Sequence, residues 1–155
     1  MPKELSIEIV PVDGSFAEVL AAIHDQSFDQ PWDAAALRRL LEAPAAVALQ
    51  AVDLDIGKTV GFVLAFAAAG EAEILSIAVA PLERKLGIGL QLLDRLIDDL
   101  KEAGATKLFL EVAADNAPAR GLYRRRKFIE TGRRKGYYIA GDGIPMDAIN
   151  LALEL

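Results

Sequence analysis

Hydrophobic and polar residues alternate with a period of two in several short stretches of this 155-residue chain. Leu5, Ile7 and Ile9 alternate with polar neighbours, which predicts a first strand. Six further short stretches are apolar enough to be strands. These predicted strands cover residues 45–52, 60–67, 73–80, 107–113, 128–139 and 146–153. Turn residues separate two pairs of them, at 53–57 and 141–143.

Two helices are predicted in the first third of the chain, where apolar residues recur at helical spacing instead. Ser15 is suited to cap the first helix, because its hydroxyl can accept a hydrogen bond from a free N–H of the first turn. The apolar residues of this helix are Phe16, Val19, Leu20 and Ile23. A second, shorter helix is expected after Trp32, with Asp33 as its cap.

The clearest helical pattern begins near Gly87 and ends at Gly104, where glycine supplies a stop. Asn116 and Pro118 mark the start of another helix, because proline is tolerated in a first turn where its missing N–H costs nothing. The whole pattern predicts one α/β (α+β) domain over residues 1–155. Its sheet should have about seven strands, mostly antiparallel, with one β-α-β crossover through the helix that starts at Gly87.

Composition narrows the class of protein. The hydrophobic residues make up 53% of the chain but form short runs, so no membrane span of ~20 residues is expected. Acidic and polar residues among Met1 to Glu4 argue against a signal peptide, and we expect a cytoplasmic protein. The chain has no cysteine and one histidine, which leaves little scope for a metal site or a serine triad. Catalysis would then rely on carboxylates, tyrosine or the backbone.

The formal charge of −6 argues against general nucleic-acid binding and is compatible with a cationic substrate. Positive charge is nevertheless concentrated near the C-terminal third. This basic cluster consists of Arg120, Arg124, Arg125, Arg126, Lys127, Arg133, Arg134 and Lys135. It is either a solvated face or a rim that faces a phosphate group.

A glycine-containing loop, Arg84 to Gly89, connects a predicted strand to the Gly87 helix. Glycines let a backbone approach a ligand closely, and the first N–H groups of a helix have no intrahelical partner. Such a junction suits a pyrophosphate, although a plain tight connection has the same pattern. The fingerprint of nucleotide dehydrogenases needs a third glycine where this chain has Leu92.

Another glycine, in Gly57-Lys58-Thr59, suggests a phosphate-binding loop at first sight. That motif requires a glycine where this chain has Val52, and no helical pattern follows it. We therefore predict a hairpin turn at this place.

The strand Ile74–Ala80 followed by Arg84-x-x-Gly87-x-Gly89 and a helix resembles the acetyl-CoA-binding motif of the GCN5-related N-acetyltransferase (GNAT) superfamily. Leu110-Glu111-Val112 and Asn116-x-x-Ala119-x-x-Leu122-Tyr123 resemble its second conserved segment. Within the superfamily, the chain is similar over nearly its whole length to the bacterial ribosomal-protein-alanine N-acetyltransferases (RimI type). The features that carry this similarity are Pro31-Trp32 after Phe28, Ser76-Ile77-Ala78-Val79, the Leu-Glu-Val triplet, Tyr137-Tyr138 and Asp147-Ala148.

The resemblance implies a GNAT-like fold and acetyl-CoA as co-substrate, with no metal. It implies that the loop backbone binds the pyrophosphate, that one strand binds the pantetheine arm beside an opened part of the sheet, and that an asparagine also contacts the arm. The cofactor-binding residues implied are Ile77, Ala78, Val79, Arg84, Lys85, Leu86, Gly87, Ile88, Gly89, Leu90 and Asn116.

Two side chains are the candidates for acid and base chemistry. The resemblance implies that Glu111 is the general base and that Tyr123 gives a proton to the departing thiolate or stabilises it. From the residues alone, Glu111 could also belong to an exposed strand face or an ion pair. Tyr123 could equally be half-buried packing.

Three aromatic residues are weaker candidates for contacts with a peptide substrate. Trp32 is either core or a wall of the peptide entrance. Tyr137 and Tyr138 should point to opposite faces of a strand, so that only one of them reaches the groove. His24 is given no role.

Two departures from the family pattern concern the cofactor site. Lys127 stands where the family has a glycine, and a left-handed conformation there would cost lysine ~1 kcal/mol. Leu86 and Leu90 replace polar or basic residues, which leaves the phosphate grip to the backbone and to Arg124 or Arg125.

The predicted function is acetyl transfer from acetyl-CoA to the α-amino group of a protein, with a ribosomal protein as partner. A ternary complex is expected, because the chain has no cysteine to carry an acetyl group. We expect no direct nucleic-acid or membrane partner. The alternatives are acetylation of a lysine side chain or small amine, and a non-catalytic acyl-CoA-binding module.

Overall fold

The computed structural model describes residues 6–28, 30–139 and 143–155. The strands are β1 Ile7–Pro11, β2 Ala46–Asp53, β3 Lys58–Ala68, β4 Glu71–Val79, β5 Lys107–Ala113, β6 Ile129–Ile139 and β7 Pro145–Glu154. The helices are α1 Ala17–Asp25, α2 Ala34–Leu41, α3 Ile88–Glu102 and α4 Ala117–Arg125, with short 3-10 turns η1 Gly14–Phe16 and η2 Pro81–Glu83. The predicted start of the first strand at Leu5 and the predicted turn at Gly141 and Asp142 lie outside the described residues.

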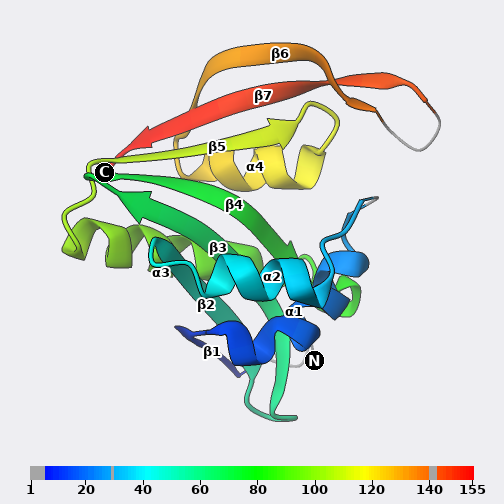
Figure 1. Ribbon diagram of the computed structural model, residues 1–155, viewed down its shortest axis with the longest axis vertical. Helices are drawn as coiled ribbons and strands as arrows, with labels where there is room; N and C mark the ends of the chain where they lie inside the picture. Colours follow the sequence, from blue (N-terminus) through cyan, green and yellow to red (C-terminus); the bar gives the residue numbers. More distant parts are fainter. Residues whose placement is uncertain (1–5, 29, 140–142) are drawn as a thin grey trace.

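The strands form one seven-stranded sheet in the order β1-β2-β3-β4-β5-β7-β6 (Figure 1). All neighbouring pairs are antiparallel except β4 and β5, which are parallel and joined through α3. This confirms the predicted fold class, including the single β-α-β crossover. The predicted hairpin at Gly57 is also confirmed, because this residue has φ 63° in the turn between β2 and β3.

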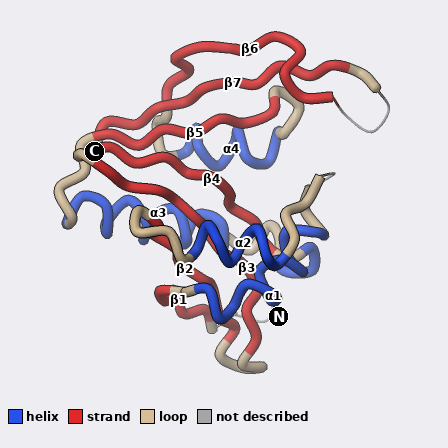
Figure 2. The backbone as a smooth tube through the Cα atoms, viewed as in Figure 1, coloured by secondary structure: helices blue, strands red, loops and turns tan. Residues whose placement is uncertain are grey.

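Helices cover both faces of the sheet, as the tube view in Figure 2 shows. One core lies under α3 and also contains Tyr123 and Phe128 from the α4 region. The other core lies between α1, α2 and the opposite face of β3 and β4, around Leu20, Leu37 and Phe62. The part of this second face formed by β5, β7 and β6 is not covered by α1 and α2 (Figure 1).

Most of the predicted helix starts are confirmed, and one is wrong. Asp33 caps α2 by accepting from the N–H of Ala36 at 2.8 Å. Ser15 does not cap α1, because Asp13 accepts from the Ser15 N–H at 2.9 Å and starts the 3-10 turn η1 instead. The buried face of α1 also differs from the face that was predicted to be buried. Its buried residues are Ala17, Leu20, Ile23 and His24, whereas Phe16 and Val19 are exposed.

The sheet opens between its two central strands. β4 pairs with β5 over four residue pairs, from Glu71 with Lys107 to Ile74 with Leu110. Beyond that point β4 continues to Val79 and β5 to Ala113, but these two strands no longer pair with each other. They diverge in Figure 1. A bulge accompanies this divergence, since Leu75 has no partner between the pairs Ser76–Leu64 and Ile74–Ala65 of β3. Bulges bend a strand locally, and this one bends β4 where the pairing stops.

Candidate functional site

A cavity of about 770 Å³ lies at the opening between β4 and β5. It is bordered by both strands, by α4, by the end of α1 and by β6. Openings at the carboxyl ends of parallel strands are common places for ligands in α/β sheets. Seven of the predicted site residues line it: Trp32, Ile77, Glu111, Asn116, Tyr123, Tyr137 and Tyr138.

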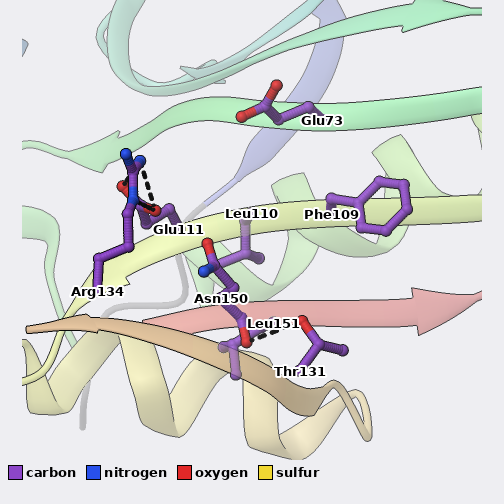
Figure 3. Close-up of a pocket in the computed structure, with 8 residues that line it drawn as sticks. All are labelled: Glu73, Phe109, Leu110, Glu111, Thr131, Arg134, Asn150 and Leu151. Atoms are coloured by element: carbon purple, nitrogen blue, oxygen red, sulfur yellow. Dashed lines mark hydrogen bonds and ion pairs between the residues drawn. The ribbon is translucent and has the colours of Figure 1, made fainter. Parts of the chain in front are cut away.

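Glu111 lies on the face of β5 opposite Leu110 and Val112, as the alternation of the strand predicts. Its carboxylate forms a two-point ion pair with the guanidinium of Arg134 from β6 (Figure 3). Arg134 Nε lies 2.9 Å from Glu111 Oε2 and Arg134 Nη2 lies 2.8 Å from Oε1. The ion-pair alternative for Glu111 is therefore present in the structure. It is compatible with a role as base, because a carboxylate has about four lone-pair sites and this pair uses two.

A second, smaller cavity of about 360 Å³ shares Glu111 with the first. It lies on the uncovered face of the sheet and is lined by polar residues that include Glu73, Thr131 and Asn150 (Figure 3). Glu111 thus stands at the boundary between a largely apolar opening and a polar, solvent-facing hollow. A carboxylate at such a boundary can pass a proton to bulk water.

Tyr123 is buried in α4, with 4% of its surface exposed, and its ring packs edge-on against Phe128 at 5.3 Å. Burial raises the pKa of the Tyr123 phenol above its ordinary value of 10.0. The group therefore keeps its proton at neutral pH. It can act as a proton donor toward the cavity but not as a base.

Asn116 has the capping role that its sequence context allows. Its side-chain oxygen accepts from the N–H of Ala119 at 3.2 Å at the start of α4, while the residue also lines the cavity. Its amide nitrogen remains able to donate to a ligand, because only the oxygen is used in the cap.

The prediction that Tyr137 and Tyr138 point to opposite faces is wrong, because both line the large cavity. Their rings meet edge-on at 5.2 Å. The register of β6 against β7 shifts between Arg134 and Tyr138, and Gly136 has φ 62° there. This irregularity breaks the alternation on which the prediction depended.

The loop from Arg84 to Leu90 does not line this cavity; it follows η2 and leads into α3. Gly87 is the N-cap of α3 with φ 82°, and Lys85 before it has φ 64°. The first intrahelical bond runs from the Gln91 N–H to the Gly87 carbonyl at 3.0 Å. The N–H groups of Ile88, Gly89 and Leu90 precede that bond, as an anion-binding helix start requires.

The side chains of the loop differ in what they offer near these N–H groups, and Lys85 is exposed and able to add positive charge. Leu86 is 53% exposed, whereas Ile88 is buried and anchors the helix start in the core. Arg84 is directed elsewhere, since its guanidinium donates to the Val79 carbonyl at 3.0 Å and to Ser27 Oγ at 3.1 Å. The predicted grip through the backbone is consistent with this geometry.

The basic cluster divides into paired and exposed members. Arg126 forms a two-point ion pair with Asp94 that ties the end of α4 to α3. Arg120 donates to the Ala114 carbonyl at 2.9 Å, and Arg133 pairs with Glu130 and Asp147. Arg124 and Arg125 are exposed at the end of α4. Lys127 and Lys135 are exposed as well, so these four members of the cluster are the ones suited to contact a phosphate.

Two cavity residues have no role in the sequence-based prediction. His24 is 3% exposed and its ring stacks between Phe28 at 4.3 Å and Trp32 at 4.8 Å. Ser76 is 6% exposed, and its Oγ is buried without a hydrogen-bond partner. The signal for His24 is its place four residues after Leu20 on the buried stripe of α1. The signal for Ser76 is a hydroxyl inside an otherwise apolar strand.

Within the described ranges, no group of three or more His, Cys, Asp and Glu side chains is arranged to hold a metal ion. Over the same residues, no helix combines the length and hydropathy that crossing a bilayer requires.

Curated relatives match this chain in sequence. A ribosomal protein bS18-alanine N-acetyltransferase from Escherichia coli K12 is 40% identical over 99 residues, which are 64% of this chain and 66% of the relative. The enzyme of the same name from Haemophilus influenzae is 35% identical over 66% of this chain and 69% of its own length. The match to the Escherichia coli enzyme thus spans slightly less than two thirds of the length of that enzyme.

Solved structures share the architecture over almost the whole chain. The crystal structure of the ribosomal-protein-S18-alanine N-acetyltransferase from Escherichia coli superposes with a TM-score of 0.89 at 30% identity, covering 96% of this chain and 93% of that one. Arabidopsis thaliana NAA60 in complex with a bisubstrate analogue has the same fold, with a TM-score of 0.83 at 23% identity over 96% and 98% of the two chains. The model of the acetyltransferase (GNAT) family matches residues 17–128. With its sheet opened beside β4 and its glycine-capped α3, this chain belongs to the acetyltransferase (GNAT) family.

Proposed function

We propose that this protein transfers the acetyl group of acetyl-CoA to the α-amino group of a protein, and that the acceptor is the N-terminal alanine of a ribosomal protein. The observation that carries this proposal is the meeting of Glu111 and Tyr123 at one cavity where β4 and β5 separate. One is a carboxylate at the border to water and the other is a buried phenol that keeps its proton.

The residues present fit acetyl-CoA. Beyond Ile74, one edge of β4 pairs with β3 while the edge toward β5 is free, so its N–H and C=O groups can pair with the amides of a pantetheine arm. Ile77, Ala78 and Val79 belong to this stretch, in which the Val79 carbonyl already accepts from Arg84. A Cβ built on Gly87 meets nothing within 4 Å, so the approach to the helix start is open. The co-substrate supplies the acetyl group as a thioester.

Glu111 takes up the proton that the acceptor amine loses when it attacks the thioester carbonyl, either directly or through one water. Tyr123 gives its proton to the departing thiolate sulfur, and the free N–H groups of β4 polarise the acetyl carbonyl. One N–C bond forms and one C–S bond breaks, while one proton goes from nitrogen to Glu111 and another from Tyr123 to sulfur.

An α-amine suits this base better than a lysine side chain does. With pKa values of about 8 and 10.4, roughly 10% of an α-amine but only ~0.04% of a lysine amine is neutral at pH 7. The names of the relatives from Escherichia coli and Haemophilus influenzae support a ribosomal acceptor. We place the reaction in the cytoplasm, where that acceptor is made, and assign it to one domain of residues 1–155.

A peptide panel tests the acceptor class. The purified protein is given acetyl-CoA and alanine-initiated peptides with free or formylated N-termini, each containing an internal lysine, and products are mapped by mass spectrometry. We expect acetylation at free N-termini only. Acetylation of blocked peptides at lysine, or turnover of small amines alone, would contradict the proposal. A ribosomal-protein pool treated in the same way identifies the acceptor.

Two substitutions test the roles of the residues. Glu111→Gln should lower kcat by about 10²-fold with an unchanged KM for acetyl-CoA, the usual scale for loss of general base catalysis. Tyr123→Phe keeps the packing on Phe128 and should also lower kcat. The exposed Glu73→Gln on the same face of the sheet is the matched control for lost charge. If both site variants keep full activity, or the protein binds acyl-CoA without turnover, a binding module is the better description.

A further inference from the structure

Arg134 forms a two-point ion pair with the proposed base, a contact that is absent from the sequence-based assignment. Of the described residues that line the two cavities, Arg134 is the one lysine or arginine. Its two nitrogen atoms hold both oxygens of Glu111 at 2.9 Å and 2.8 Å. A fork-shaped contact of this kind fixes the plane of a carboxylate.

The Arg134 side chain has to cross the neighbouring strand to reach Glu111. Strand β7 lies between β5 and β6, and Arg134 faces Ala148 while Glu111 faces Asn150. Ala113 of β5 also faces Ala148, so these side chains share one face of the sheet. The small Ala148 lets the long arginine side chain cross β7 diagonally. A large residue at this position would obstruct it.

Tyr137 holds the other side of the guanidinium. The Arg134 Cζ atom lies 3.8 Å from the centroid of the Tyr137 ring. The ring reaches this place because β6 is irregular at Gly136, whose N–H donates to Asp147 Oδ1 at 3.0 Å. Tyr137, Arg134 and Glu111 therefore form a continuous row that ends at the base.

The contact with Arg134 does not block the carboxylate. Two lone-pair sites of Glu111 stay free, and its side chain is 17% exposed and lines both cavities. Arg134 itself is 53% exposed, so its charge is solvated and it does not close the cavity. The guanidinium leaves the proton-accepting positions open and limits the directions in which they point.

We infer that Arg134 is a positioning residue, held by Tyr137, that keeps the Glu111 carboxylate oriented toward the acceptor amine. The inference rests on the proposed function for its catalytic meaning. Other titratable groups line the same cavities with Glu111 and contribute to its field: His24, Glu73, Asp115, Tyr123, Tyr137 and Tyr138. None of these is a permanent cation.

The kinetic test compares charge with geometry. Arg134→Ala should lower kcat/KM for a free α-amine peptide by about tenfold to a hundredfold, with an unchanged KM for acetyl-CoA. Arg134→Lys keeps the charge without the fork, so kcat should still fall in this variant, again with an unchanged KM for acetyl-CoA. Tyr137→Ala should lose more activity than Tyr137→Phe, which keeps the ring.

The matched control is Arg133→Ala, on the adjacent position of β6, where the guanidinium pairs with Glu130 and Asp147 instead. It should match the wild-type kcat and KM. An Arg134→Ala enzyme with the wild-type kcat/KM would overturn the inference. So would a faster enzyme, which would mean that Arg134 obstructs the base, or an Arg134→Lys enzyme at the full wild-type rate.

A readout without turnover separates this inference from the proposed function. The Glu111 carboxyl resonance in ¹³C NMR at neutral pH, assigned from the Glu111→Gln spectrum, should have a different chemical shift in Arg134→Ala than in the wild type and an unchanged one in Arg133→Ala. If the wild type acetylates no α-amine, the proposed function fails, and this comparison still decides the role of Arg134. An identical chemical shift in the wild type and in Arg134→Ala would overturn the inference whatever the acceptor.

Discussion

The backbone N–H of Trp32 donates a hydrogen bond to Nδ1 of His24 at 3.0 Å. Nδ1 can accept this bond only without a proton, so His24 is neutral in the folded protein and carries its hydrogen on Nε2. The same bond ties the segment after α1 to the ring stack of His24, Phe28 and Trp32 that borders the large cavity.

Stability should therefore fall in mild acid. Burial lowers the pKa of His24 from its ordinary value of 6.5, so the unfolded chain binds this proton at higher pH than the folded chain. The stabilisation is fully present above pH 6.5 and is lost as the pH falls below it toward the folded-state pKa. Thermal unfolding between about pH 7.5 and 5.5 should show a fall in Tm for the wild type.

The variant His24→Phe keeps a ring in the stack but cannot titrate. It should have a lower Tm at neutral pH, because the Trp32 N–H loses its acceptor, and a flatter dependence on pH. An equally steep dependence in this variant would assign the effect to other groups.

Ser76→Ala should stabilise the ligand-free protein. The hydroxyl of Ser76 is buried without a partner, and an unsatisfied buried polar group costs about 1 to 3 kcal/mol. We expect a gain of about 1 kcal/mol in the free energy of unfolding, measured with urea. Ser27→Ala is the control, because its hydroxyl donates to Ile23 and accepts from Arg84, and it should destabilise. A loss of stability in Ser76→Ala would show that the hydroxyl has a partner in solution.

Substitutions at Gly89 should act mainly on cofactor binding, whereas a substitution at Arg84 should act mainly on stability. A Cβ on Gly89 would lie 3.7 Å from the Leu122 side chain, an ordinary contact, so Gly89→Ala should fold normally. It should nevertheless raise the KM for acetyl-CoA severalfold, since a side chain then stands among the N–H groups at the start of α3, and Gly89→Val should raise it further.

Arg84→Ala removes bonds to Val79 and Ser27 and should act mainly on Tm, with a much smaller change in KM. Steady-state kinetics and thermal unfolding of the variants provide the comparison. A larger KM effect from Arg84→Ala than from Gly89→Val would mean that side-chain charge, and not the backbone, binds the pyrophosphate.

Lys127→Gly should raise the free energy of unfolding by up to about 1 kcal/mol, because Lys127 has φ 65°, where a Cβ is strained and glycine is not. Lys135→Gly within β6 should instead destabilise, since glycine weakens a strand. Urea unfolding measures both. Activity should not change in Lys127→Gly, and a loss of stability there would contradict the account of strain.

Periodicity carried most of the prediction of the fold. The strand Lys107–Ala113 matches β5 at both ends, and the helix expected from Gly87 matches α3 within a residue of its cap. The rotation of α1 was not predictable from local spacing. Phe16 and Val19 are apolar but exposed, and His24 is polar but buried, because its ring is satisfied by Trp32 and two aromatic neighbours.

The members of the site were predictable from motif resemblance, while their mutual geometry was not. Glu111, Asn116 and Tyr123 line one cavity as expected. The pairing of Glu111 with Arg134 depends on strand order across β7 and on the irregularity at Gly136. The register between strands that are far apart in sequence leaves no periodic pattern in the sequence. For the same reason, the sequence did not predict that Tyr137 and Tyr138 line the same cavity.

The short pairing of β4 with β5 also has a consequence for the reaction. The pairs that end at Ile74 and Leu110 join two parts of the sheet, one made of β1 to β4 and the other of β5, β7 and β6. Glu111 and Arg134 belong to the second part, whereas the free N–H groups of β4 belong to the first. The angle at which the two parts meet therefore sets the distance between base and electrophile, and a substitution that alters this angle changes that distance even when it lies far from the cavity.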